Sequence, residues 1–292
     1  MDALKVVKAQ KKPNLLSLAK AALVGGYTTA SELVKGKVDD IKQNLKNVYE
    51  NKIIPGVSTA ISSTDPKTLV KIYDLASRIG ISKRKRKKHA KANQEQLDSS
   101  NLVERSVAET GFIENQNNSE WDNIKYGWSN LGNAGCGIFA TYNTLIALGA
   151  NVSSKDLVDI ITFYEESGCS LGGLIGTSPL AVQRYFTKKG VKTHLEYDSS
   201  EKKLNELGNS STYTAYIGLA LNNATDIRDG GHYVSINRTM NPYANYATSP
   251  YLYKVHNAYV EGNNYYSLYN AVHYSSSLSS LCVLGVSSQA IK

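Results

Sequence analysis

The sequence contains little cysteine, phenylalanine and tryptophan, and it has no long hydrophobic run. Its 292 residues include 3 Cys, 4 Phe and 2 Trp. Three widely spaced cysteines exclude a disulfide framework, and no pair of them has the spacing of zinc ligands. No stretch approaches the roughly 18 consecutive apolar residues that a membrane-spanning helix needs. The cysteines are therefore expected to be free thiols, of which one could be reactive.

The start of the chain does not have the pattern of a secretory signal peptide. Its mildly apolar stretch, from Leu15 to Val24, contains Lys20 and is too short to cross a bilayer. We expect a soluble protein with no transmembrane segment, either cytoplasmic or delivered as part of a secreted effector.

Positive charge is concentrated in the first third of the chain. Of the 33 Lys/Arg and 25 Asp/Glu, residues 1–110 hold 21 and 11, a net charge of +10. Residues 111–292 hold the remaining 12 and 14, a net charge of −2. Such asymmetry suggests that the first third meets an acidic partner or surface.

The pattern predicts three parts along the chain. Residues 1–80 read as a basic, mostly helical region, with helices expected from Ser31 to Lys52 and after Asp65-Pro66. Residues 81–110 read as a charged linker, because six consecutive cations from Lys83 repel one another and do not suit a packed core. Residues 111–292 then read as one domain.

The domain over residues 111–292 is predicted to be α+β. Helical spacing from Gly135 to Gly149 is followed by two further helices, which begin after Ser153 and Ser178. After Gly190 the period changes towards two, which predicts strands over Val191–Leu195, Tyr213–Leu221, His232–Asn237, Leu252–His256, Tyr265–Tyr269 and Leu281–Val286. Helices followed by strands indicate an antiparallel sheet, not a βαβ repeat.

Cys136 stands at the first turn of a predicted helix, directly after a loop rich in Gly and Asn. The free N–H groups and the dipole of a helix N-terminus stabilise a thiolate and can receive an oxyanion. The same position also suits a small cysteine of the core.

Two later segments could supply the partners of a catalytic thiol. His232 begins a predicted strand after Gly230-Gly231, and Asn257 ends the next predicted strand. Adjacent antiparallel strands could place the side-chain amide oxygen of Asn257 beside His232, where it would fix the imidazole tautomer. His256 directly precedes Asn257 on this strand, so its side chain is expected to point to the opposite face of the sheet.

These segments resemble the papain-like cysteine peptidases, in particular their compact bacterial branch near the bacteriocin-processing, double-glycine peptidases. The matching patterns are Gly135-Cys136-Gly137-x-x-Ala140 with Asn143 downstream, Gly231-His232-Tyr233-Val234, and the strand that ends at Asn257. The resemblance covers roughly residues 112–290, and implies a nucleophile-bearing helix packed on an antiparallel sheet.

The resemblance implies a Cys136–His232–Asn257 triad that attacks an amide or peptide carbonyl, without a metal or organic cofactor. The family usually has an oxyanion-hole Gln six residues before the nucleophile. Asn130 occupies that position here, and Asn133 is a rival for the role.

Several alternatives stay open. The fold also serves protein glutamine deamidases and transglutaminases, and an inactive papain-like binding module is a further reading. The architecture resembles the effector domain of a secreted bacterial toxin, for which an immunity or inhibitor protein is the expected partner beside a protein or peptide substrate. The basic run from Lys83 to Lys91 could contact nucleic acid or another anionic surface.

Overall fold

A computed structural model of the chain describes residues 65–78, 81–222, 231–244, 249–258, 264–275 and 279–288. The chain divides into two compact units, and all of these residues belong to the second, which comprises Asp65–Ala224 and Asp229–Lys292. The helix expected from Ser31 to Lys52 lies outside the described residues. None of the described helices combines the length and the hydropathy needed to cross a membrane.

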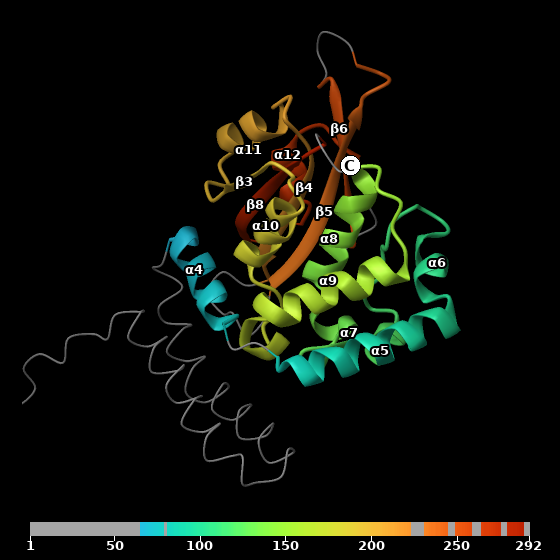
Figure 1. Ribbon diagram of the computed structural model, residues 1–292. Helices are drawn as coiled ribbons and strands as arrows, with labels where there is room; N and C mark the ends of the chain where they lie inside the picture. Colours follow the sequence, from blue (N-terminus) through green and yellow to red (C-terminus); the bar gives the residue numbers. More distant parts are fainter. Residues whose placement is uncertain are drawn as a thin grey trace, which may run out of the picture. The chain divides into compact units, whose positions relative to one another are not determined.

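The second unit is an α+β fold around one antiparallel sheet of six strands (Figure 1). The strand order is β3-β8-β4-β5-β6-β7. The bounds are Thr193–Glu196 for β3, Tyr213–Leu221 for β4, Gly231–Met240 for β5, Tyr251–His256 for β6, Asn264–Tyr265 for β7 and Ser279–Ser287 for β8. The α+β class and the antiparallel sheet are therefore as predicted.

Helices cover both faces of this sheet. On one face, α11 (Glu201–Gly208) and α12 (Leu268–Val272) enclose a core that includes Tyr216, Val234 and Tyr253. On the other face, α8 (Cys136–Ala147) packs against β4 and β5, and α10 (Pro179–Lys188) packs against β3 and β8. Since α8 is buried along most of its length, the packing fixes the helix that carries Cys136.

Local capping explains where the predicted helices begin. In α9 (Ser154–Ser167), Ser153 and Asp156 form the expected capping box. Ser178 caps α10, and a proline follows it at the first helical turn. Helix α4 (Pro66–Ala76) begins in the same way after Asp65, whose carboxylate accepts from the Thr68 N–H at 3.0 Å. These helix starts confirm the sequence predictions.

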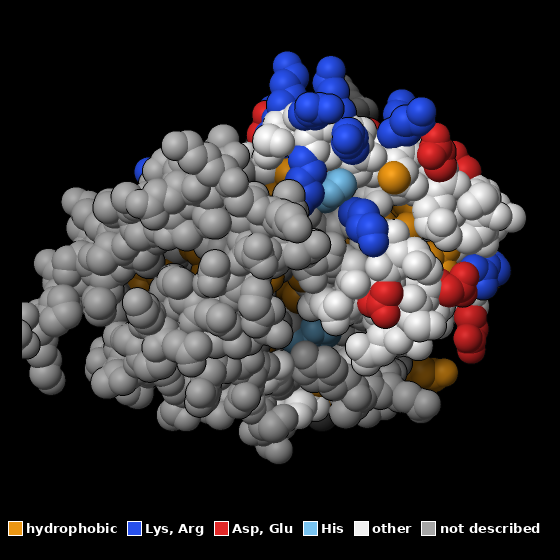
Figure 2. All heavy atoms as spheres, turned by 90° about the horizontal axis from the view of Figure 1, so that it is seen from below, with side chains coloured by type: hydrophobic (Ala, Val, Ile, Leu, Met, Phe, Trp, Pro, Cys, Tyr) orange, Lys and Arg blue, Asp and Glu red, His pale blue; other side chains and the backbone are white. Residues whose placement is uncertain are grey.

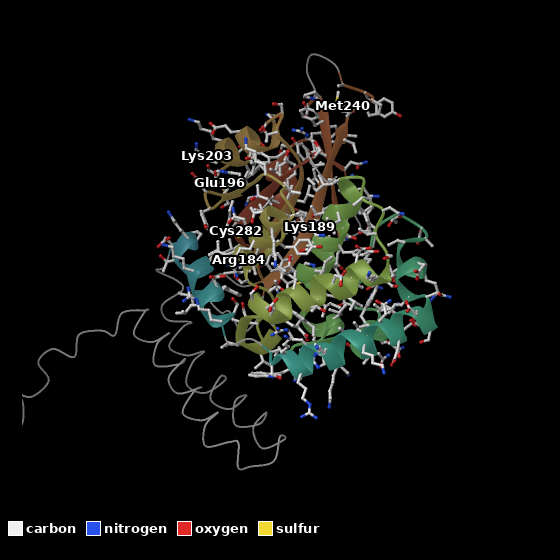
Figure 3. The ribbon with its side chains drawn as sticks, viewed as in Figure 1. Arg184, Lys189, Glu196, Lys203, Met240 and Cys282 are labelled. Carbon is white, nitrogen blue, oxygen red and sulfur yellow. The ribbon has the colours of Figure 1, made fainter. Side chains whose placement is uncertain are left out.

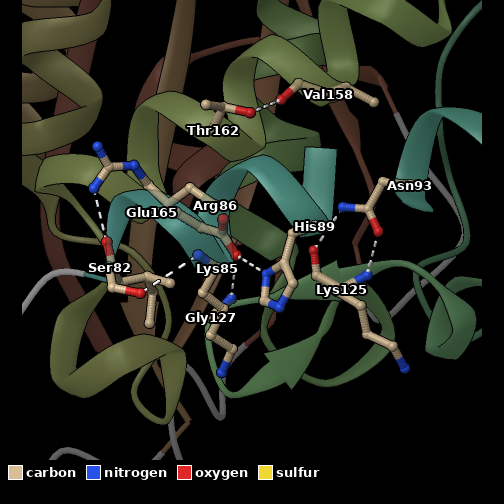
Figure 4. Close-up of polar contacts among 11 residues, drawn as sticks. Ser82, Lys85, Arg86, His89, Asn93, Lys125, Gly127, Val158, Thr162 and Glu165 are labelled. Carbon is tan, nitrogen blue, oxygen red and sulfur yellow. Dashed lines mark hydrogen bonds and ion pairs between the residues drawn. The ribbon is translucent and has the colours of Figure 1, made fainter. Parts of the chain in front are cut away.

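Residues 83–100, predicted to be part of a linker, instead form α5 (Lys83–Ser100), which packs on α9. His89 lies 2.5 Å from the Glu165 carboxylate, which also accepts from the Gly127 N–H at 2.7 Å (Figure 4). Asn93 pairs with both main-chain groups of Lys125, and Leu97 is fully buried. The linker prediction is wrong here because Lys83, Arg84, Lys87 and Lys88 are exposed, whereas residues spaced by four on the opposite face pack inward.

Helix α6 (Leu102–Val107) continues this packing into the remainder of the predicted linker, with Leu102 and Val103 buried. At the other end of the unit, Arg184 of α10 donates to Asp74 of α4 at 2.7 Å and to the Ser167 carbonyl at 2.8 Å. Figure 3 labels Arg184 at this junction. The compact unit therefore begins at Asp65, well before the boundary at residue 111 that the composition predicts.

Candidate functional site

Cys136 lies at the N-terminus of α8, against the start of β5. Its Sγ lies 4.0 Å from the carbonyl oxygen of Gly231, the residue before His232. The N–H of Tyr233, the residue after His232, also interacts with the sulfur. The thiol therefore contacts the main chain on both sides of His232. Gly137, the next residue, packs closely against Thr177, whose side chain would lie 2.8 Å from a Cβ at this position.

Both groups are nearly enclosed, and burial shifts both towards their neutral forms. Cys136 is 7% exposed and His232 is 5% exposed. Burial raises the pKa of the Cys136 thiol, and the N–H groups of Tyr233, Gly137 and Cys136 only partly offset this. Burial likewise lowers the pKa of His232, with a smaller opposing contribution from its hydrogen bond to Asn257. The free protein thus favours a neutral thiol and a neutral imidazole over a preformed ion pair.

His232 contacts Asn257, but through the main chain. The Nε2 atom of His232 lies 2.5 Å from the Asn257 carbonyl oxygen. A carbonyl only accepts, so Nε2 carries the proton and Nδ1 is left as the basic nitrogen. The expected bond from the Asn257 side-chain amide is replaced by this one, since the side chain pairs with Gln116 at 3.1 and 3.2 Å.

A polar cavity of about 290 Å³ opens beside His232 and Asn257. It is lined by Glu114, Asn115, Gln116, Asn117, Gly132, Asn133, His232, Asn257 and Ala258. Among the described residues, His232, Asn257 and Asn133 are therefore in the lining, whereas Cys136 and Asn130 are not. The Asn130 side chain caps the short helix α7 (Leu131–Ala134), accepting from the Asn133 N–H at 2.9 Å.

Two polar residues that the sequence did not single out, Glu114 and Gln116, connect the parts of the site. Gln116 donates to the Gly132 carbonyl at 2.9 Å, which joins Asn257 to the loop before Cys136. Glu114 accepts from the Asn257 N–H at 2.9 Å and pairs with His256 at 2.7 Å. His256 is fully buried, so it belongs to this interior pair rather than to the surface.

The other two cysteines are also buried. Cys169 is fully buried, with Gly127 and Gly173 packed against its sulfur. Cys282 lies within β8 (Figure 3), and burial raises the pKa of its thiol to about 12. Over the described part of the chain, no cluster of three or more His, Cys, Asp or Glu side chains has the arrangement of a metal site.

Comparison with models of protein families, with curated proteins and with solved structures gives no match to this chain. The resemblance to papain-like peptidases thus depends on the local motifs and on the geometry described above.

The neutral forms of Cys136 and His232 predict how the rate of Cys136 alkylation depends on pH. Because its pKa is raised, we expect alkylation by iodoacetamide to be slow near neutral pH and to accelerate above the ordinary thiol range. Because the pKa of His232 is lowered, its base form should persist below the ordinary histidine range. Mass spectrometry of the Cys136 peptide against pH measures the rate. An alkylation plateau at mildly acidic pH would indicate an ion pair and contradict this expectation.

Proposed function

We propose that the second unit is a papain-like cysteine hydrolase acting on an amide or peptide bond. The observation that carries the proposal is the joint geometry of a helix-borne thiol and a histidine. Cys136 contacts the main chain that flanks His232, and the Asn257 carbonyl fixes the protonated nitrogen of that histidine. A nucleophile next to an oriented base is the arrangement that covalent catalysis requires.

The reaction begins when Nδ1 of His232 takes the proton of Cys136. The sulfur attacks the substrate carbonyl carbon, and a negative charge develops on the carbonyl oxygen. The N–H groups of Cys136 and Gly137 at the start of α8 and the side-chain amide of Asn133 stabilise that charge, with Asn130 as the family's positional equivalent. His232 then protonates the leaving amine and the C–N bond breaks. Water, deprotonated by His232, hydrolyses the thioester and restores the thiol.

Related activities at the same site differ in the amide group that the thiol attacks or in the molecule that accepts the acyl group from the thioester. A glutamine deamidase releases ammonia from a side-chain amide, and a transglutaminase passes the acyl group to an amine. Among the described residues that line the cavity beside His232, most of the side chains are polar, five of them amides, and Ala258 is apolar. It therefore suits a polar substrate group, such as a glutamine side chain, better than a large apolar one.

Selective labelling tests the proposal. At mildly alkaline pH, iodoacetamide should modify Cys136 faster than the fully buried Cys169, and His232→Ala should slow the labelling of Cys136 relative to that of Cys169. The comparison is made within one protein, so overall reagent reactivity cancels. Equal labelling of the two cysteines, or labelling of Cys136 that does not depend on His232, would instead favour an inactive papain-like binding module.

The biological setting that fits the basic N-terminal third and a small hydrolase unit is a delivered bacterial effector or toxin. Its partners are then a protein or peptide substrate in the target cell and an immunity protein that occupies the site in the producing cell. Production of the chain inside a bacterium tests this setting, because toxicity should require Cys136.

The exposed face of α5 suits an anionic partner. Lys83, Arg84, Lys87 and Lys88 are exposed there, and Figure 2 shows Lys and Arg side chains gathered on this face. Among the described residues, the ion pairs of α5 involve Arg86, His89 and Lys91. The helix presents no large exposed hydrophobic side chain, which disfavours insertion into a bilayer or stacking on bases. Contact with nucleic-acid phosphates through charge alone fits this face best.

Such contact should depend steeply on salt. If four of these cations each neutralise one phosphate, affinity for a DNA duplex should fall roughly a hundredfold between about 50 and 200 mM salt. The double variant Lys87→Glu/Lys88→Glu should remove most of the binding in a fluorescence anisotropy titration. Lys202→Glu/Lys203→Glu on α11 makes the same charge change elsewhere and should have a smaller effect. Equal effects of the two pairs would indicate non-specific attraction only.

A further inference from the structure

The carboxylate of Glu114 holds both residues of the turn that follows β6. Its Oε1 lies 2.7 Å from Nδ1 of His256, and its Oε2 accepts from the Asn257 N–H at 2.9 Å. The other ring nitrogen of His256 lies 2.8 Å from the Asn237 amide, and Phe112 stacks on the ring at 3.7 Å. His256 is therefore fixed on three sides, and the main chain after it is fixed by the same carboxylate.

The turn itself has an uncommon backbone conformation. Asn257 has φ of 57°, in the left-handed region that residues other than glycine rarely adopt. Asparagine tolerates this region better than most residues, but the conformation still needs support from its surroundings. The support comes from Glu114 on the main-chain N–H and from Gln116 on the side chain. The carbonyl of the same residue, Asn257, contacts His232.

The segment that carries Glu114 is attached to the nucleophile helix. Asn143, fully buried on α8, accepts from the Ile113 N–H at 2.9 Å and donates to the Ile113 carbonyl at 2.8 Å. Hydrogen bonds, together with the peptide bond between Ile113 and Glu114, thus connect the helix of Cys136 to the turn that contacts His232. These connections join residues more than 140 positions apart in the sequence.

We infer that Glu114 is a positioning residue for His232. It holds the turn at 256–257 so that the Asn257 carbonyl keeps the proton of His232 on Nε2 and leaves Nδ1 as the base. The inference rests on the proposed hydrolase function for its catalytic meaning. The position of the proton on His232 is a property of the folded protein and can be measured without a substrate.

The test uses the full chain and its Glu114→Gln variant. Nitrogen NMR of the imidazoles should show His232 protonated on Nε2 in the wild type and a mixture of tautomers in Glu114→Gln. Cys136-dependent turnover should fall at least about tenfold, because loss of the tautomer-fixing partner impairs the base. Glu120→Gln, which removes a carboxylate from the exposed pair with Arg105, is the matched control and should change neither result. Thermal unfolding of each variant reports on the fold.

The possible outcomes separate the two proposals. An unchanged His232 tautomer and unchanged turnover in a folded Glu114→Gln variant would overturn the inference and leave the hydrolase intact. A changed tautomer together with an unreactive wild-type Cys136 would support the positioning role and reject the hydrolase.

If Glu114→Gln does not fold, substitutions of Asn257 provide a second test. Glycine keeps the carbonyl and readily adopts a positive φ, whereas alanine adopts it at a cost. The inference expects Asn257→Gly to retain the Nε2 tautomer and Asn257→Ala to lose part of it. Equal loss in both would show that the side chain, not the clamped carbonyl, orients His232.

Discussion

Replacement of Cys136 with alanine is expected to reduce hydrolysis by a factor on the order of 10³ or more, because the covalent route needs the sulfur. The substitution removes one buried atom from a side chain that is 7% exposed, so the fold should persist. Mass spectrometry of proteins incubated with the wild type or with Cys136→Ala would reveal cleaved chains or deamidated glutamines. The mass change also distinguishes peptidase from deamidase activity.

The matched control is Cys282→Ala, which removes the same atom from a thiol buried within β8. It should leave turnover intact if the role of Cys136 is chemical. In bacteria that produce the chain, growth should be restored by Cys136→Ala and not by Cys282→Ala. Equal growth of wild type and Cys136→Ala would remove the toxin setting, and equal turnover would remove the hydrolase.

Elements with strong local signals could be predicted from the sequence. Strand β4 has the predicted bounds, Tyr213–Leu221, and α9 and α10 begin at their predicted caps. A prediction fails where two local sequence patterns favour different secondary structures. The sequence predicts a strand over Tyr265–Tyr269, yet β7 ends at Tyr265 and the Ser267 side chain caps α12. The aromatic pattern indicated a strand, whereas the cap determines a helix.

The candidate site was predictable only in part, because its polar contacts join distant segments. Cys136, His232 and Asn257 each stand in a recognisable local motif, and the structure brings all three to one end of β5 and β6. The atom that meets His232 was not predictable, since it depends on the left-handed turn at Asn257. Glu114 belongs to no recognisable sequence motif, because its partners His256 and Asn257 lie over 140 residues away in the sequence.

Helix α5 shows why a charged run can be misread. Six consecutive cations suggest a solvated linker, and the inward residues His89, Asn93 and Leu97 are spaced by four within a polar context. Two of these three are polar, so hydrophobic periodicity does not reveal the buried face. Their burial is stabilised by partners that lie elsewhere in the sequence, Glu165 and Lys125.

Removal of residues 1–110, as the composition-based boundary would suggest, is expected to leave a chain that does not fold. Residues 65–110 contribute six buried aliphatic side chains to the unit, namely Leu69, Val70, Ile81, Leu97, Leu102 and Val103. At about 1.5–3 kcal/mol each, their burial contributes roughly 9–18 kcal/mol as an upper estimate, which equals or exceeds the whole stability of a typical domain. The shortened chain would also leave Glu165 buried without His89.

The matched comparison is a chain that begins at Asp65, where the second unit begins. This chain should unfold cooperatively in a thermal or urea titration followed by circular dichroism, whereas the chain that begins at Gly111 should show no cooperative transition. Only the longer chain should retain the slow, pH-dependent alkylation of Cys136, because that behaviour depends on burial. A stable, cooperative fold from Gly111 onward would show that α4, α5 and α6 are accessory, and would restore the boundary that the composition predicts.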